Sequence, residues 1–319
     1  MTKRALILGA GQDASYLAEI LLAEKREVHL MHRRSSVDNL ARVRHLLDRV
    51  TLHRGDLTDF GSLLYLLVTV QPSVIYNMAD QDNVGWSNGS PLYSADVTYK
   101  GVANLLETMR QTDWDRRVRL FQPVSALMFG DAPAPQDEGT PLAPRSPYAC
   151  AKAGAFLLCR HYRREHGLHV SCGIMYNHCS PRRSEGYLLP KICASAVRIA
   201  RGLQDKLTLG NLEQLVDIGF AKEYMRAAYR TLMVQPDDFC IATGESFPIS
   251  YLVKHAFELA GVKGDPMDRI EVDPSFLPSG LLSSGCEKAH KELCWNPEHN
   301  AENVVKMLVE HYERKVDAI

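Results

Sequence analysis

The sequence predicts a doubly wound α/β fold, in which helices cover both faces of a parallel sheet. Over the first two thirds of the 319 residues, short apolar runs alternate with longer segments of helical periodicity. The apolar runs are continuous, which is typical of strands that are buried on both faces. After about Tyr176 this rhythm ends, and polar loops rich in proline, arginine and glycine separate shorter helices. We therefore expect a smaller C-terminal lobe.

The elements follow from these runs in chain order. The expected strands are Ala5–Leu8, Glu27–His32, Val50–His53, Ser73–Asn77, Arg117–Pro123 and His169–Met175. The helices expected between them are Asp13–Ala23, Phe60–Val70, Ser94–Gln111 and Pro147–Glu165. In the C-terminal part we expect helices at Leu188–Arg201, Lys222–Thr231, Ile249–Ala260, Glu287–Leu293 and Ala301–Arg314, with a returning strand at Phe239–Ala242.

The composition excludes several classes of protein. With 45% hydrophobic and 24% charged residues, the chain resembles an ordinary globular protein, which rules out a disordered or collagen-like chain. Lysine and arginine total 37 against 38 aspartate and glutamate, so we expect neither nucleic-acid nor membrane binding through bulk charge. The eight cysteines form no CxxC pair, which predicts reduced thiols in a cytoplasmic protein and no metal site. No apolar segment suggests a secretion signal or a membrane span.

A glycine-rich turn directly follows the first expected strand. The residues Gly9-Ala10-Gly11-Gln12-Asp13-Ala14 give the pattern GxGxxA at the start of a helix. Glycine at positions 9 and 11 allows a tight turn and lets the backbone approach a pyrophosphate, which the helix N-terminus also attracts. A purely structural turn is the alternative. The glycine turn follows the first strand of an alternating chain, and this position favours a dinucleotide site and a Rossmann-like sheet.

Two arginines after the second expected strand bear on the choice of cofactor. A binder of NAD usually carries an acidic residue there for the ribose hydroxyl, but this chain reads Arg33-Arg34-Ser35-Ser36. Guanidinium groups and hydroxyls suit a 2′-phosphate, so Arg33 and Arg34 favour NADP, and NAD is the alternative cofactor. A solvated basic loop would explain the same residues without a ligand.

Tyr148 and Lys152 are four residues apart in a predicted helix, so their side chains share one face. A lysine charge lowers the pKa of a nearby phenol, and the tyrosinate can take a proton from a sugar hydroxyl while hydride leaves for nicotinamide. Ser125 follows the fifth expected strand, where its hydroxyl can bond the same substrate oxygen. A YxxxK pair also arises by chance, and a lone serine there is more often a turn residue. Together the three predict a catalytic set.

A series of motifs carries a resemblance to a known family. They are GAGQDASYLAE, RRSS, GDLTD at Gly55–Asp59, SPYxxxK, NHxSPRR at Asn177–Arg183, LGN at Leu209–Asn211, AKEY at Ala221–Tyr224, IATGE at Ile241–Glu245 and LCWNP at Leu293–Pro297. In these motifs the chain resembles the extended short-chain dehydrogenase/reductases, and among them the GDP-mannose 4,6-dehydratases. The resemblance runs in order over nearly the whole chain.

The resemblance implies roles for further residues. It implies that the adenine is flanked by Asp56 and Leu57, and that the rest of the cofactor is lined by Gln12, Asp13, Ala79, Gln81, Tyr93, Tyr148, Lys152, His178 and Arg183. It also implies that Ser125, Asn177, Lys191 and Asn211 face a nucleotide-sugar, and that the protein is a homodimer or homotetramer. For single residues a structural role is an even alternative, such as a helix cap for Asp56 or a solvated side chain for Lys191.

The same resemblance divides the chain by function. We expect a dinucleotide-binding domain over residues 1–176, with return segments near 215–245, and a nucleotide-sugar-binding lobe over residues 177–319. The substrate is then expected to be a GDP-linked sugar. These boundaries place the glycine turn and the YxxxK pair in the first domain and the NHxSPRR and LGN motifs in the second.

The chain departs from the family at its active-site strand. The family carries Thr-Ser-Glu, whose glutamate removes the proton from sugar carbon 5, whereas this chain reads Ser125-Ala126-Leu127. A leucine accepts no proton, so oxidation at carbon 4 is retained while the base for dehydration is missing. The glycine turn is one residue shorter than in the family, and two family arginines are replaced at Val216 and Leu277. Arg182, Arg183 and Lys191 are the remaining candidate anion contacts.

These departures from the family rank the expected functions from the most to the least favoured. Reversible hydride transfer at carbon 4 without the carbon 5 base favours a 4-epimerase of a GDP-linked sugar, and a 4-keto sugar reductase is a related outcome. A 4,6-dehydratase that uses Asp80, Asp82 or a water molecule as its base is the main alternative. A non-catalytic nucleotide-sugar-binding relative is the remaining one, although retention of Tyr148 and Lys152 counts against it.

Overall fold

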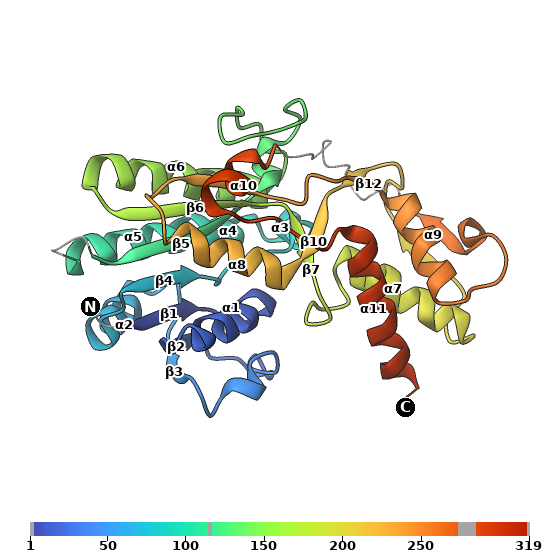
Figure 1. The fold of residues 1–319 in the computed structure, drawn as a ribbon, viewed down its shortest axis with the longest axis horizontal. Helices are drawn as coiled ribbons and strands as arrows, with labels where there is room; N and C mark the ends of the chain where they lie inside the picture. Colours follow the sequence, from blue (N-terminus) through green and yellow to red (C-terminus); the bar gives the residue numbers. More distant parts are fainter. Residues whose placement is uncertain (1–2, 114–116, 274–284, 318–319) are drawn as a thin grey trace.

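A parallel sheet of seven strands forms the centre of the computed structural model, which describes residues 3–113, 117–273 and 285–317 (Figure 1). Its strands are β1 (Arg4–Leu8), β2 (Glu27–His32), β3 (Thr51–Arg54), β4 (Val74–Asn77), β5 (Arg119–Ser125), β6 (His169–Met175) and β11 (Asp238–Ile241). They lie in the order β11-β6-β5-β4-β1-β2-β3. The chain order reverses between β1 and β4, where sheets of this kind bind ligands at the carboxyl ends of their strands.

Helices cover both faces of this sheet. The helices α2 (Phe60–Val70), α5 (Gly101–Thr112) and α6 (Pro147–His166) lie on one face, and α1 (Gln12–Ala23) and α8 (Ala221–Thr231) lie on the other. Each face has its own hydrophobic cluster, in which Leu66 and Phe156 are buried on one side and Leu17 and Tyr224 on the other. The prediction of a Rossmann-like doubly wound fold is confirmed.

A smaller lobe lies beyond the sheet, at the right of Figure 1. Its helices are α7 (Leu188–Ala200), α9 (Ile249–Leu259) and α11 (Ala301–Val316), which share a third hydrophobic cluster. Short strands pair there as β7 (Asn177–Cys179) with β10 (Ile218–Phe220), β9 (Leu215–Val216) with β12 (Phe247–Pro248), and β8 (Leu207–Leu209) with β13 (Ile270–Val272). The helix α10 (Glu287–Leu293) returns to the first lobe and packs against α8 and β11.

The structure differs from the expected elements mainly before β5. A short helix α3 (Val84–Gly89) was not expected, and the next helix begins at α4 (Pro91–Ser94) and passes through a π-helical segment η2 (Ala95–Lys100) into α5. Ser125 is the last residue of β5, because that strand begins and ends two residues later than expected. The short strands of the C-terminal lobe have two or three residues, too few to show a period in the sequence.

Among the described residues, no helix combines the length and the apolar character that a membrane span requires.

Candidate active site

A pocket of about 1070 Å³ opens at the carboxyl ends of β1, β4 and β5 and continues to the C-terminal lobe. Its wall includes the glycine turn, the YxxxK pair and residues of β7 and α7. The volume exceeds the range of about 300–1,000 Å³ that is usual for a single small ligand. The pocket is therefore large enough for a cofactor and a substrate side by side.

The glycine turn has the geometry of a pyrophosphate cradle. Gly9 has a φ of +108°, and a Cβ built on it would lie 2.6 Å from the carbonyl oxygen of Met78, so only glycine fits there. Gly11 is the N-cap of α1, and a Cβ on it would meet no atom within 4 Å. The backbone amides at the start of α1 thus face open space in the pocket, where an anion is stabilised by the helix dipole.

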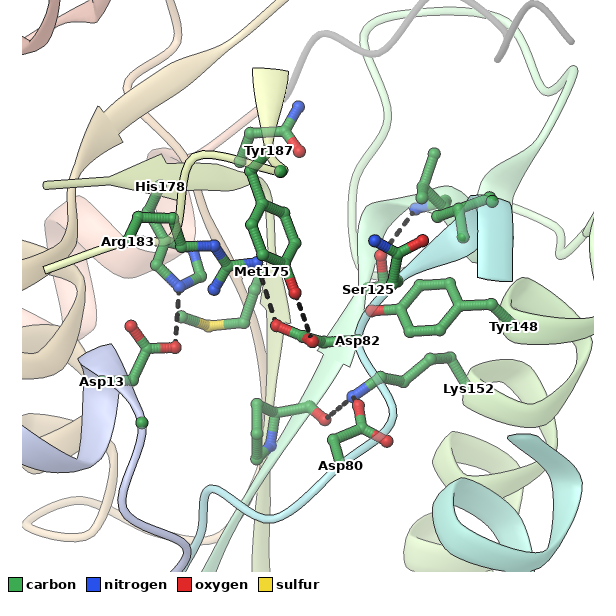
Figure 2. Close-up of a pocket in the computed structure, with 18 of the residues that line it drawn as sticks. Asp13, Asp80, Asp82, Ser125, Tyr148, Lys152, Met175, His178, Arg183 and Tyr187 are labelled. Carbon is green, nitrogen blue, oxygen red and sulfur yellow. Dashed lines mark hydrogen bonds and ion pairs between the residues drawn. The ribbon is translucent and has the colours of Figure 1, made fainter. Parts of the chain in front are cut away.

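An ion pair beside this turn joins the two lobes. His178 Nε2 lies 3.0 Å from Asp13 Oδ2, and the other ring nitrogen contacts the Tyr176 carbonyl (Figure 2). Burial raises the pKa of Asp13, but the His178 and Arg183 charges outweigh burial and lower this pKa to about 2. Asp13 is therefore charged at neutral pH, and its hydrogen bond to His178 ties the N-terminus of α1 to β7.

Residues that are expected to contact the adenosine part of the cofactor also line the pocket. Arg33 donates a hydrogen bond to the Tyr93 hydroxyl at 3.0 Å, and both side chains line the pocket. Asp56 and Leu57 lie beside them, with Asp56 Oδ1 accepting from the Thr58 amide. Arg33 follows β2, Asp56 and Leu57 follow β3, and Tyr93 lies on α4, so the fold brings them together.

Some predicted site residues do not line the described pocket. They are Gln12, Arg34, Gln81 and Lys191. The Gln12 side chain is buried between Asp13 and Ser180, and that of Gln81 folds back onto the Asn83 backbone. Lys191 Nζ donates to the Thr208 carbonyl at 2.6 Å. The remaining predicted residues are on the wall, including Gly9, Gly11, Ala79, Ser125, Asn177 and Asn211.

The three expected catalytic residues converge at the floor of the pocket. Tyr148 and Lys152 lie on the first turns of α6, which begins at Pro147 after the N-cap Ser146. The Ser125 hydroxyl accepts from the Leu127 amide at 3.2 Å, which leaves its proton for the Tyr148 oxygen. The structure thus places a hydroxyl, a phenol and an ammonium group next to one another, as Figure 2 shows.

The charge balance around Tyr148 differs from the expectation. Burial raises the pKa of Tyr148, and the Asp80 and Asp82 carboxylates raise it further. The Lys152 ammonium lowers this pKa, as expected, but only offsets part of the rise. The phenol is consequently protonated at neutral pH, because two acidic side chains stand near it in addition to the lysine.

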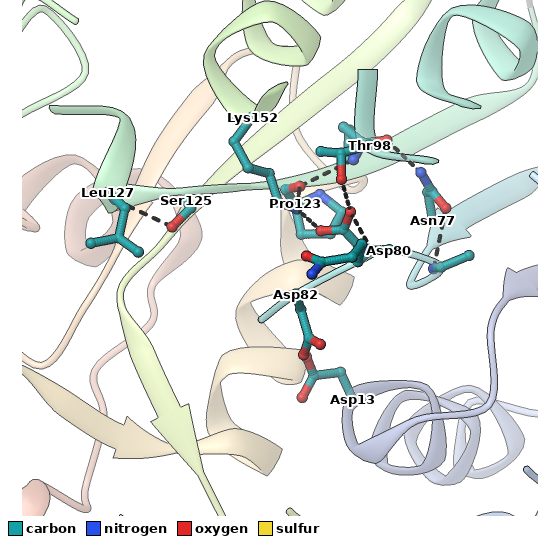
Figure 3. Close-up of polar contacts among 12 residues, drawn as sticks. Asp13, Asn77, Asp80, Asp82, Thr98, Pro123, Ser125, Leu127 and Lys152 are labelled. Atoms are coloured by element: carbon teal, nitrogen blue, oxygen red, sulfur yellow. Dashed lines mark hydrogen bonds and ion pairs between the residues drawn. The ribbon is translucent and has the colours of Figure 1, made fainter. Parts of the chain in front are cut away.

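Lys152 is held in place by two oxygen partners. Its ammonium donates to the Pro123 carbonyl at 3.0 Å and forms an ion pair with Asp80 (Figure 3). Burial lowers the pKa of Lys152, but Asp80 and the other nearby groups outweigh burial and raise it. The second Asp80 oxygen accepts from the Thr98 hydroxyl in η2. The lysine is therefore permanently charged and has a fixed position.

Leu127 takes the place of an acidic side chain in the pocket. It lies in the single turn η3 (Ala126–Phe129) that follows β5, lines the pocket and packs against the hydrophobic cluster of α2, α5 and α6. Val216, the site of a missing family arginine, also lines the pocket and is 4% exposed. The other missing arginine, at Leu277, lies outside the described residues. Leu127 and Val216 therefore present aliphatic side chains on the described wall of the pocket.

The structure adds polar residues that the motifs did not assign firmly. Asp82 accepts from the Tyr187 hydroxyl at 2.6 Å and pairs with Arg183 at 2.9 Å. The Arg183 guanidinium also stacks on the Tyr187 ring, 3.7 Å from its centre. Tyr187 had no signal in the sequence, because its partner Asp82 is 105 residues away. By contrast, Arg182 pairs with Glu19 and Ser15 outside this pocket.

Comparisons with known proteins agree with this arrangement. A model of the family described as GDP-mannose 4,6 dehydratase matches residues 6–308. GDP-mannose 4,6 dehydratase 1 of Arabidopsis thaliana is 39% identical over 323 residues, which cover 97% of this chain and 89% of that protein. A GDP-mannose 4,6-dehydratase of Vibrio cholerae is 36% identical over 97% of this chain and 93% of that protein.

Solved structures share the fold at lower identity. UDP-glucose 4-epimerase from Thermotoga maritima superposes with a TM-score of 0.86 at 20% identity, over 98% of this chain and 99% of the other. The dTDP-glucose 4,6-dehydratase of Bacillus anthracis gives 0.85 at 21% identity, over 98% and 97%.

The fold and the family match define an enzyme of the extended short-chain dehydrogenase/reductase class. The resemblance drawn from the sequence motifs is confirmed. The chain belongs to the GDP-mannose 4,6-dehydratase family. This family does not support the expected 4-epimerase, whereas it does support the dehydratase alternative.

Proposed function

We propose that this protein is a GDP-sugar 4,6-dehydratase that uses a nicotinamide cofactor, with NADP favoured over NAD. The observation that carries the proposal is that Ser125, Tyr148 and Lys152 meet in a pocket that also holds the Asp80 and Asp82 carboxylates. Membership of the GDP-mannose 4,6-dehydratase family supports the choice of reaction and of the GDP-linked hexose.

The residues of the pocket suit a dinucleotide. Gly9 and Gly11 leave room for a pyrophosphate at the N-terminus of α1, and Arg33 stands at the other end of this half of the pocket. Arg33, Arg34 and the two serines after them support a 2′-phosphate and hence NADP. When bound, the nicotinamide supplies the hydride acceptor and later the hydride donor.

The catalytic residues account for the oxidation of carbon 4. Tyr148, as tyrosinate, takes the proton of the carbon 4 hydroxyl, and the Ser125 hydroxyl bonds the same oxygen. The fixed Lys152 charge stabilises the tyrosinate against the nearby carboxylates. The resulting 4-ketone makes the carbon 5 proton acidic, which prepares loss of the carbon 6 hydroxyl as water.

The decisive experiment is to incubate the purified protein with GDP-mannose and NADP and to identify the product by NMR. We expect a 4-keto-6-deoxy sugar, with no product from the Tyr148→Phe variant. A product that keeps its carbon 6 hydroxyl and differs only in configuration at carbon 4 would contradict the proposal and indicate a 4-epimerase. A carbon 4 alcohol formed with consumption of NADPH would indicate a reductase.

We also propose that the protein forms a homo-oligomer through one side of the first lobe. Large apolar side chains are exposed on neighbouring elements there, with Trp86 on α3, Leu92 on α4, Tyr99 on η2 and Leu157 on α6. Their exposed fractions run from 44% to 80%, which is unusual for a free surface. Light scattering should give a multiple of 35.7 kDa, and a monomer would contradict this part of the proposal.

The division of the chain between its ligands is part of the same proposal. Residues 1–176, with the return segments near 215–245, hold the cofactor, and residues 177–319 hold most of the nucleotide-sugar. The mixed wall of the pocket supports this, because Asn177 and Asn211 of the second segment line the same pocket as the catalytic pair.

A further inference from the structure

The proposed dehydration needs a base at carbon 5, and the pocket offers few groups for it. The carboxylates on its described wall are Asp13, Asp56, Asp80 and Asp82, and that part of the wall has no glutamate. Two of these carboxylates lie in the half of the pocket that is proposed to bind the cofactor. Asp13 pairs with His178 beside the glycine turn, and Asp56 accepts from Thr58 after β3.

Asp80 is already occupied by other groups. Its Oδ1 accepts from the Gln81 amide at 2.8 Å and from the Thr98 hydroxyl, and its Oδ2 pairs with the Lys152 ammonium. The side chain is only 14% exposed. A proton taken by Asp80 would break the contact that holds Lys152, so this carboxylate is a positioning group.

Asp82 has the exposure and orientation that the step requires. Its side chain is 46% exposed, and each oxygen accepts one bond, from Tyr187 or from Arg183. These bonds fix the carboxylate, and each oxygen keeps a further lone pair. Figure 2 shows the group between Arg183 and Tyr187 on one side and Ser125 and Tyr148 on the other.

Asp82 is near enough to the catalytic pair for its charge to act on both residues. Burial has the largest influence on the pKa of Tyr148 and on that of Lys152, and the Asp82 charge raises both. A sugar whose carbon 4 oxygen contacts Tyr148 has carbon 5 one bond from carbon 4. Because the Tyr148 hydroxyl points toward Asp82 in Figure 2 and both line the pocket, such a sugar can present carbon 5 to this carboxylate.

We propose that Asp82 is the general base of the dehydration and replaces, from a different loop, the glutamate that is absent at Leu127. This inference rests on the proposed function. Leu127 is on η3 after β5, whereas Asp82 is in the loop between β4 and α3, so the two approach the pocket from different strands.

The step balances with the groups present. Asp82 accepts the carbon 5 proton, the electron pair of that C–H bond forms the double bond between carbons 5 and 6, and the C6–O bond breaks. The carboxylic acid returns its proton to the departing oxygen, and water leaves. The hydride taken from carbon 4 then adds to carbon 6, and a solvent proton adds to carbon 5 through Asp82. Dehydration is redox-neutral overall.

The test compares the Asp82→Asn variant with the natural protein in deuterated water, with GDP-mannose and NADP. Two signals are followed, namely reduced nicotinamide by absorbance in a single turnover and deuterium at carbon 5 by NMR. We expect the variant to form reduced nicotinamide at a rate near that of the natural protein, but to lose carbon 5 exchange and the 6-deoxy product by about 10²–10⁴-fold. Asp96→Asn, on an exposed side chain outside the pocket, is the matched control and should change neither signal.

A second pair of variants separates a chemical role from a structural one. In the Asp82→Asn background, Leu127→Glu should restore carbon 5 exchange, whereas Leu127→Gln, of equal size, should not. A merely structural Asp82 predicts that neither restores it, and that result overturns the proposal. Undiminished exchange in Asp82→Asn also overturns it, while leaving the dehydratase intact. Absence of both signals in the natural protein would instead overturn the proposed function and with it this inference.

Discussion

The two halves of the pocket differ in how they are built. The cofactor half depends on backbone geometry, since Gly9 and Gly11 shape the turn and the start of α1 faces open space. The sugar half depends on side chains from separate segments, such as Leu127 from η3 and the Asp82 to Tyr187 contact across 105 residues. The cofactor half is thus set by residues close together in the sequence, whereas the sugar half depends on contacts between distant segments.

We expect the largest effect from removing the Tyr148 hydroxyl, which both halves of the pocket share. Tyr148→Phe deletes the proton acceptor at carbon 4, so turnover of GDP-mannose should fall by about 10²–10⁴-fold. The glycine turn and Arg33 are unchanged, so NADP should still bind, as measured by titration calorimetry. Tyr65→Phe, on an exposed tyrosine of α2, is the control. If Tyr148→Phe kept its activity, the catalytic set would be wrong.

Two glycine variants test the backbone of the cofactor half. Gly9→Ala places a methyl group 2.6 Å from a carbonyl at a φ of +108°, so the free energy of unfolding should fall by about 1–3 kcal/mol or more. Gly11→Ala meets no atom of the protein, so its thermal stability should be unchanged, whereas its methyl group occupies the space expected for the pyrophosphate and should weaken NADP binding about 10- to 100-fold. Equal NADP affinity in Gly11→Ala and the natural protein would show that no pyrophosphate binds there.

A smaller effect is expected on the preference for NADP over NAD, which we attribute to Arg33 in the cofactor half of the pocket. Arg33 lines the pocket and Arg34 does not, so Arg33→Ala should weaken NADP binding about 10- to 100-fold and leave NAD binding unchanged. Arg34→Ala is the matched comparison and should have the smaller effect. Tighter binding of NAD than of NADP by the natural protein would contradict the assignment.

The smallest expected effect concerns pH. Tyr148 acts as tyrosinate and its pKa is raised by burial and by the Asp80 and Asp82 charges, so the rising limb of the carbon 4 oxidation rate should lie at higher pH than the ordinary pKa of a tyrosine would give. Asp80→Asn removes one negative charge, which lowers the pKa of Tyr148 and moves the rising limb of the pH profile to lower pH. Asp48→Asn, an exposed site, should leave the limb unchanged. A shift of the Asp80→Asn limb to higher pH would contradict this electrostatic account.

The sequence predicted the sheet well because each strand is a continuous apolar run. All seven strands of the central sheet form within two residues of their expected bounds. The glycine turn and the YxxxK pair were equally clear, because their chemistry is local. The π-helical segment that brings Thr98 to Asp80, and the Asp82, Arg183 and Tyr187 contacts, depend on tertiary packing and leave no periodic signal. The same packing decides why Gln12 and Gln81 turn away from the pocket.

The central claim is that hydride moves from carbon 4 to carbon 6 of one sugar. GDP-mannose that carries deuterium at carbon 4 tests this most directly, with NMR of the product. We predict deuterium in the new methyl group at carbon 6. Deuterium that returns to carbon 4 with inverted configuration, or that accumulates on the cofactor, would contradict the account.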